Sequence, residues 1–167
     1  MRPQDVVVAA RLALDPGGTW SYERLASELG MSSQTVHASV QRLASSRLFN
    51  VVRRRIARQE FLEFVEHGVR FAFPAHRGSH PVRGLPTGSS GPPLASKLPA
   101  GEDASLVWPD KRGQAVGTGL VPLHRSAPGY AKSNPRLYDI LTLIDAVRVG
   151  GAREREVASV ELRKRLS

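Results

Sequence analysis

The chain lacks cysteine altogether, is sparing in aromatic residues and has no long hydrophobic segment. Without thiols it can form neither a disulfide nor a thiolate metal site, which suits a reducing compartment. No stretch approaches the roughly 18 apolar residues that a membrane-spanning helix requires. The first apolar run is short and is interrupted by Arg11 and Asp15, so it does not fit a signal peptide. We therefore expect a cytoplasmic protein without a membrane partner.

Acidic residues are scarce relative to basic ones. The 167 residues contain 15 Asp and Glu against 24 Lys and Arg, which gives a net charge of +9. An excess of this size favours nucleic acid or another polyanion as the partner. The length suits one domain with a core, or a small domain with an extension.

Two amphipathic helical segments are predicted between residues 21 and 45. Ser21 fits the N-cap of the first helix, Gly30 fits the residue that ends it, and Ser32 fits the N-cap of the second. The apolar residues repeat with helical spacing: Tyr22, Leu25, Ala26 and Leu29, then Val36, Val40 and Leu43. A short turn between two such helices is typical of a helix-turn-helix.

The second of these helices would turn hydrogen-bonding side chains outward. Gln34 and Gln41 can donate and accept at once, as reading an adenine edge requires, and the start of the helix suits a phosphate. An ordinary helix pair with a solvated polar face is the alternative interpretation. The candidate DNA-binding residues here are Ser32, Ser33, Gln34, Thr35, His37, Ala38, Gln41 and Arg42.

Residues 42–58 carry six arginines and no acid. Arg53, Arg54 and Arg55 form the densest run and are candidates for phosphate contacts, which add affinity without choosing a base. A solvated basic surface is the alternative.

The stretch "YERLASELGMSSQTVHASVQRLASSRLF" resembles the helix-turn-helix of prokaryotic winged-helix transcriptional regulators, the broad MarR-like and GntR-like superfamily. The resemblance implies a recognition helix over residues 33–45, with phosphate contacts from Ser32 and Thr35. It also implies a homodimer that reaches successive major grooves. By the same resemblance the base-reading positions are Ser33, Gln34, His37 and Gln41.

One feature of that superfamily is not evident in the sequence. A winged helix places a β-hairpin with a Gly- or Asp-rich tip after the recognition helix, and "RLFNVVRRRIARQEF" contains no glycine. We expect the wing to be reduced to a short strand, or replaced by a helix that starts near Asn50 or Val51.

Further along, residues 55–68 predict a helix that ends at Gly68, and residues 69–74 predict a strand. Residues 77–101 contain five glycines and five prolines, a density that predicts a loop or extended linker. Two short extended pieces are expected within residues 105–123. Residues 134–149 and 152–166 predict two helices separated by Gly150 and Gly151. Val157, Val160, Leu162 and Leu166 are expected on the inner face of the second.

The sequence therefore predicts a mainly α protein with minor β structure. We expect a winged-helix-like helix-turn-helix domain over residues 1–75 and a Pro/Gly-rich extended segment over 76–135. A helical pair would complete the chain over 136–167. The predicted function is sequence-specific binding of double-stranded DNA as a transcriptional regulator, with repression favoured.

Two other function classes remain open at the level of the sequence. The first is an antitoxin, which would bind a partner toxin through residues 77–135 and regulate its own operon. The second is a nucleic-acid-processing enzyme anchored by the N-terminal module, which would need a cluster of carboxylates or histidines. His76 and His80 are four residues apart, but Gly78 and Pro81 argue against the helix that would align them. We predict no metal, no cofactor and no enzymatic activity.

Overall fold

A computed structural model gives the structure of the protein and describes residues 1–15, 17–98 and 105–166. The fold is mainly α with minor β structure, as expected from the sequence. None of its helices, within the described part of the chain, has the length and apolar content needed to cross a membrane.

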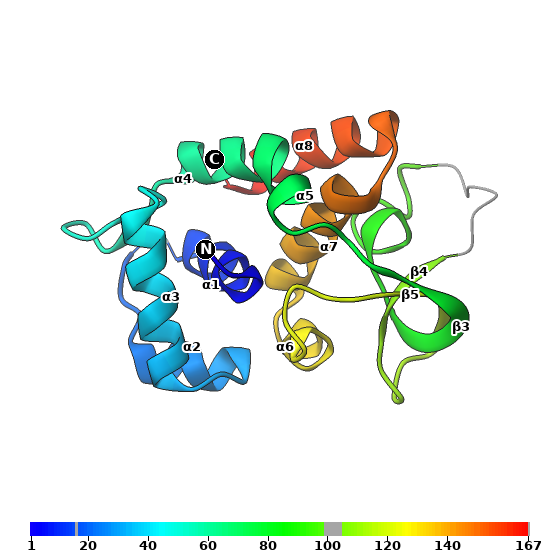
Figure 1. Cartoon of the computed structure of the whole chain (residues 1–167), viewed down its shortest axis with the longest axis horizontal. Helices are drawn as coiled ribbons and strands as arrows, with labels where there is room; N and C mark the ends of the chain where they lie inside the picture. The colour runs from blue at the N-terminus through cyan, green and yellow to red at the C-terminus, as the bar shows by residue number, and fades with distance from the viewer. Residues whose placement is uncertain (16, 99–104, 167) are drawn as a thin grey trace.

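Helix α1 (Pro3–Ala13) lies at the centre of the molecule, between α3 (Ser33–Ser45) and α7 (Pro135–Val149) (Figure 1). Its apolar residues pack against α3 on one side and α7 on the other, and residues 6–10 are fully buried. The N-terminal helices and the C-terminal half of the chain therefore share one hydrophobic core.

The two amphipathic helices predicted between residues 21 and 45 are present as α2 (Tyr22–Leu29) and α3, joined by a short turn. Ser21 caps α2 by accepting the Arg24 backbone N–H at 3.2 Å, and Gly30 ends the helix in the left-handed conformation with φ of 58°. A glycine adopts this conformation without steric cost. The apolar residues of both helices face the core as predicted.

A short antiparallel hairpin follows α3, formed by β1 (Phe49–Asn50) and β2 (Arg55–Ile56). The hypothesis of a helix starting near Asn50 is wrong, because the next helix, α4 (Arg58–Glu63), begins only after the hairpin. Helix α4 continues through a π-helical turn (Phe64–Gly68) into α5 (Val69–Ala72).

The predicted stop at Gly68 and the predicted strand over residues 69–74 are wrong. Phe61, Val65 and Val69 are all buried, so the apolar stripe with its four-residue spacing runs straight past Gly68. Packing of this stripe against α7 and α8 (Ala152–Leu166) keeps the chain helical.

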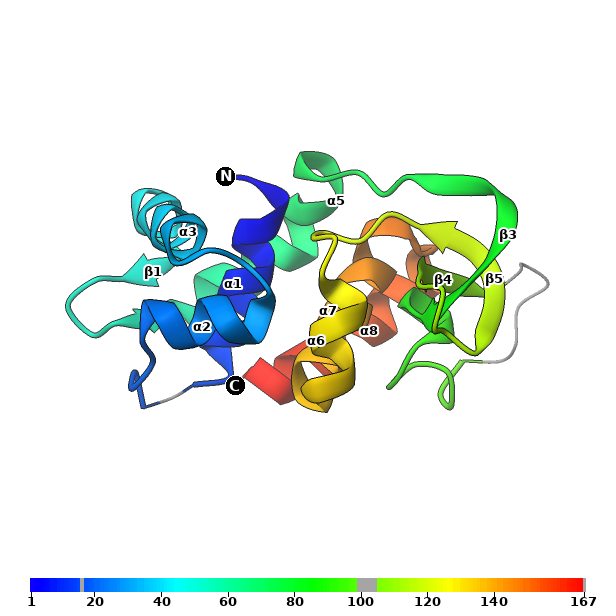
Figure 2. The same cartoon turned by 90° about the horizontal axis from the view of Figure 1, so that it is seen from below.

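The prediction of a loop or extended linker over residues 77–101 is wrong for its first part, which forms strand β3 (Arg77–Pro86). Residues 99–101 of that prediction lie outside the described residues. β3 pairs antiparallel with both β4 (Leu106–Pro109) and β5 (Ala115–Leu120), and β4 and β5 pair in parallel. The two extended pieces expected within residues 105–123 are these two strands. The small sheet occupies the end of the molecule opposite the β1–β2 hairpin (Figure 2).

The glycines of this sheet allow unusually close strand contacts, which explains why a glycine-rich stretch is not a loop. A Cβ atom on Gly84 would lie 2.0 Å from the carbonyl oxygen of Trp108, and one on Gly117 would lie 2.0 Å from that of Ser105. These backbone positions exclude any side chain.

The Gly84→Ala variant is expected to lose about 1–3 kcal/mol of unfolding free energy, because the strands must separate to admit the methyl group. Thermal unfolding measures the loss. Gly129→Ala is the matched control: Gly129 lies in α6 (Ala127–Ser133), where a Cβ would meet nothing within 4 Å. There the same change should stabilise the protein slightly, since alanine favours helix. Equal effects of the two variants would contradict this packing.

The two predicted C-terminal helices are α7 and α8, and they pack against each other. Val160 of α8 is 43% exposed, so its predicted inward position is wrong, whereas Leu162 and Leu166 are buried as predicted. Helix α7 also binds strand β4 through the buried Asp145 carboxylate, which accepts the Trp108 indole N–H at 2.6 Å. Burial raises the pKa of Asp145.

Candidate nucleic-acid interface

Helix α3 buries one side and exposes the other. Ser32 caps the helix by accepting the Thr35 backbone N–H at 3.1 Å, which fixes where the first turn begins. The side that faces α1 and α2 is buried and contains Val36, Ser39, Val40 and Leu43. The exposed side carries all four predicted base-reading residues, Ser33, Gln34, His37 and Gln41.

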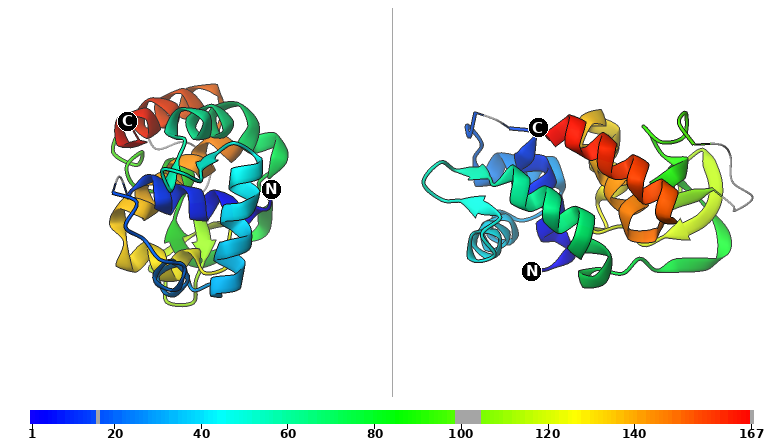
Figure 3. Two further views of the ribbon diagram at one scale, coloured as in Figure 1. Left: turned by 90° about the vertical axis from the view of Figure 1, so that its left-hand side faces the viewer. Right: turned by 90° about the horizontal axis from the view of Figure 1, so that it is seen from above.

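This exposed side of α3 lies on the outer surface of the molecule. In the left view of Figure 3, α3 lies at the front, with the β1–β2 hairpin next to it. The four side chains offer hydroxyl, amide and imidazole groups, which can both donate and accept hydrogen bonds. They come from successive turns of one helix, which places them along a single line.

The candidate residues of α3 differ in whether contacts within the protein already engage their side chains. The hydroxyls of Ser32 and Thr35 lie 2.8 Å apart and form a hydrogen bond with each other. His37 packs its ring on that of Tyr22, with 5.0 Å between the ring centroids. Ala38 is half-buried at the flank of the helix. Tyr22 was not among the sequence candidates, although it is one of few aromatic residues and directly follows an N-cap.

Arg42 is held inside the domain by Asp5 of α1. Its guanidinium donates from Nε to Asp5 Oδ2 at 2.8 Å and from Nη2 to Asp5 Oδ1 at 2.7 Å, while the Asp5 side chain is fully buried. The hydrogen bonds that Arg42 donates to Asp5 raise the pKa of Arg42. Arg42 therefore ties α3 to α1 and is not available to the candidate interface.

Arg54 is likewise engaged by a neighbouring side chain. Its guanidinium lies over the Trp20 ring at 4.7 Å from the centroid, and the Trp20 indole N–H donates to the Arg54 carbonyl oxygen at 3.1 Å. Arg54 also has a positive φ of 51°. Its role is to anchor the hairpin loop on Trp20, a partner 34 residues away that sequence spacing does not reveal.

The other residues of the hairpin loop are exposed. Asn50 shapes the loop by accepting the Arg53 backbone N–H at 2.9 Å. Val52, near the tip, is 94% exposed, and the side chains of Arg53 and Arg55 are exposed beside it. No tip glycine is needed in this loop, because Arg54 adopts the left-handed conformation.

The helix and the hairpin together form a surface with positive charges and no negative ones. Residues 32–58 include six arginines and no aspartate or glutamate. Four of the arginines, Arg47, Arg53, Arg54 and Arg55, are exposed. A surface with this charge and with hydrogen-bonding groups along a protruding helix can bind a polyanion. The chain matches no known protein family, no curated protein and no solved structure.

Proposed function

We propose that the protein binds double-stranded DNA sequence-specifically, with α3 in the major groove. The observation that carries this proposal is the exposed line of Ser33, Gln34, His37 and Gln41 on a helix whose opposite side is buried. A major groove about 12 Å wide admits one α-helix, and amide side chains can read adenine there by paired hydrogen bonds. Ser33 and the backbone N–H groups at the helix start suit a phosphate.

The β1–β2 hairpin serves as a short wing in this proposal. It lies beside α3, so that Arg53 and Arg55 reach the sugar-phosphate backbone while α3 occupies the groove. Contacts of this kind supply affinity without sequence preference. The resemblance to winged-helix regulators supports the same arrangement.

The biological role that follows is transcriptional regulation in the cytoplasm of a prokaryote. Occupation of an operator would block polymerase, so repression is the expected effect. Two copies would bind one operator as a homodimer, because a single recognition helix binds DNA weakly and two helices can reach successive major grooves.

Replacing Arg53 and Arg55 by alanine is expected to weaken binding to every DNA sequence to a similar extent. Each phosphate contact that is removed should flatten the slope of log affinity against log salt by about 0.9, since fewer counterions are released on binding. Fluorescence anisotropy over a salt series measures the slope. The control is Arg136→Ala, an exposed arginine of α7 outside the proposed interface. An unchanged slope would exclude Arg53 and Arg55 from the interface.

The proposed function is tested by selecting bound fragments from the genome that encodes the protein. The expected result is a small set of fragments that share a sequence, each bound at least about a thousandfold more tightly than random DNA. Recovery of fragments without a common sequence would contradict sequence-specific binding.

An antitoxin is the second candidate function, and one observation favours it. Val116 and Val121, within the half that would bind a toxin, are 60% and 55% exposed. Both belong to strand β5 or directly follow it, so the antitoxin role assigns them to the surface that meets the toxin. An adjacent reading frame that is toxic by itself, and harmless when this protein is co-expressed, is the expected result for this role. Absence of any such reading frame would contradict the antitoxin role.

A further inference from the structure

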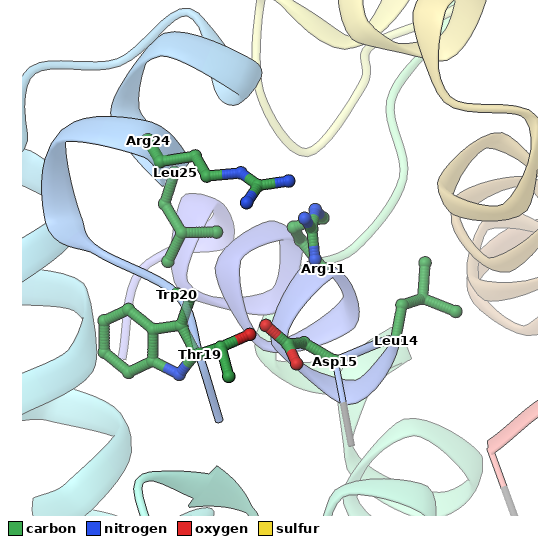
Figure 4. A pocket seen from close by; sticks show the side chains of 7 residues that line it. All are labelled: Arg11, Leu14, Asp15, Thr19, Trp20, Arg24 and Leu25. Atoms are coloured by element: carbon green, nitrogen blue, oxygen red, sulfur yellow. The ribbon is translucent and has the colours of Figure 1, made fainter. Parts of the chain in front are cut away.

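A cavity of about 240 Å³ lies between the end of α1, the loop that follows it and the start of α2 (Figure 4). Its walls combine charged, hydroxyl and apolar side chains, which are Arg11, Leu14, Asp15, Thr19, Trp20, Arg24 and Leu25. The volume is smaller than the roughly 300–1,000 Å³ of typical drug-sized ligand sites, so it suits a ligand of only a few heavy atoms. None of these residues belongs to the proposed DNA-reading face.

The positive side of the cavity is pre-organised by Glu28. Its carboxylate accepts Nε of Arg11 at 2.7 Å and Nε of Arg24 at 2.9 Å. Burial acts to raise the pKa of Glu28, and the hydrogen bonds from the two arginines outweigh it, so the pKa is lowered. Both guanidinium groups are therefore fixed through Nε, and their Nη atoms remain available to bind an anionic group.

The negative side of the cavity is formed by Asp15. Figure 4 shows its carboxylate beside the Thr19 hydroxyl, with the guanidinium groups of Arg11 and Arg24 farther up the cavity. One Asp15 oxygen accepts the Gly17 backbone N–H at 3.1 Å. The two arginines are balanced by Glu28 and Asp15, so the cavity has no net charge but has a positive and a negative end. A simple anion would find no excess positive charge here, whereas a ligand with both charges would match both ends.

We propose that this cavity binds a small zwitterion, namely a free α-amino acid with a small apolar side chain. The carboxylate of the ligand lies at the Nη atoms of Arg11 and Arg24, and its ammonium group lies at Asp15. Its side chain packs against the half-buried Leu14. Guanidinium groups bind carboxylates by paired, charge-assisted hydrogen bonds, which gives the site its orientation.

The site is connected to the hairpin through its Trp20 wall. Arg54 lies over the Trp20 ring, and a Cβ on Gly18 would lie 3.5 Å from the carbonyl oxygens of Arg53 and Arg54. A ligand bound between Asp15 and Trp20 therefore acts on the residues that contact the hairpin loop, and we expect it to change how the hairpin meets DNA. This regulatory consequence rests on the proposed DNA binding, whereas binding of the ligand does not.

NMR of the two indole N–H signals tests the ligand site, since Trp20 lines the cavity and Trp108 serves as an internal reference on Asp145. L-valine at millimolar concentration is expected to shift the Trp20 signal saturably. Isovalerate lacks the ammonium group and isobutylamine lacks the carboxylate, so each should bind at least tenfold more weakly. Asp15→Asn and Arg24→Ala should abolish the shift, and Arg136→Ala should leave it unchanged.

The outcomes separate the ligand site from its consequence for DNA. No saturable shift with L-valine, L-alanine or L-leucine would overturn the site, and equal binding of isovalerate would overturn its zwitterion preference. With DNA present, bound L-valine is expected to change operator affinity at least threefold. A ligand that binds without changing this affinity would support the site and overturn the coupling. A protein that binds L-valine but no DNA would overturn the proposed function alone.

Discussion

Replacing Asp5 by asparagine is expected to lower the free energy of unfolding by about 3 kcal/mol. The Asp5 carboxylate is fully buried and binds Arg42 through two hydrogen bonds, so its neutralisation leaves a guanidinium without its counter-charge. Breaking a buried ion pair typically costs about 3–5 kcal/mol. We expect the lower end, because the Arg42 side chain is 28% exposed and stays partly hydrated. Urea denaturation at pH 7 measures the difference.

The pH dependence of this difference identifies the charge as its cause. Burial acts to raise the pKa of Asp5, but hydrogen bonds from Arg42 and the Arg2 backbone N–H outweigh it, so the pKa is lowered. The carboxylate therefore stabilises the fold fully above the unfolded pKa of about 3.9, and this contribution is lost as pH falls through the folded pKa. The stability difference should narrow at pH 3. Glu63→Gln, an exposed change on α4, should alter stability by no more than about 0.5 kcal/mol at either pH. A difference that is the same at both pH values would argue for a packing effect instead.

Replacing Gln34 and Gln41 by alanine is expected to reduce discrimination between operator and random DNA. The expected loss is about 1–3 kcal/mol for each contact between a glutamine and a base that the change removes. The reason is that both side chains lie on the exposed side of α3, where they can pair with base edges but contribute nothing to the core. Binding to random DNA should persist, because it depends on the arginines. Competition titrations with operator and random duplexes measure the ratio.

The double change can be checked against another residue on the same helix. Ser45 lies exposed at the far end of α3, and alanine at this position should preserve the affinity ratio. Thermal unfolding of the Gln34 and Gln41 variant should match that of the unchanged protein, since neither residue is buried. Equal loss of affinity for operator and random DNA would remove both glutamines from base reading.

Local patterns in the sequence were sufficient to predict the N-terminal helices. Ser21, Gly30 and Ser32 act on their immediate neighbours, and the apolar spacing of α2 and α3 is a one-dimensional signal. The hairpin and β3 were harder to predict because their determinants are distant. Position 84 requires a glycine because the backbone of Trp108, much later in the chain, lies too close to admit a side chain. A turn at Gly84 itself is not the reason. Composition could not distinguish these two uses of glycine.

Helical periodicity explains which site residues the sequence predicted well. Positions on the exposed face of α3 follow from this spacing, so Gln34, His37 and Gln41 lie where they were expected. The arginines do not follow from periodicity, because their availability depends on partners elsewhere in the chain. Asp5 holds Arg42 and Trp20 holds Arg54, across 37 and 34 residues. A run of arginines therefore predicts charge, and the fold decides which of them remain available.

Site-directed cleavage of DNA tests the placement of α3 in the major groove most directly. The chain has no cysteine, so Ser45→Cys, at the exposed far end of α3, provides a unique attachment point for an iron–EDTA group without removing a proposed base-reading side chain. If α3 occupies the groove, strand cuts should appear within the selected fragments, centred on one major groove. The same label attached through Arg153→Cys, at the exposed start of α8, should give no localised cuts. Cuts from position 153 but none from position 45 would contradict this placement.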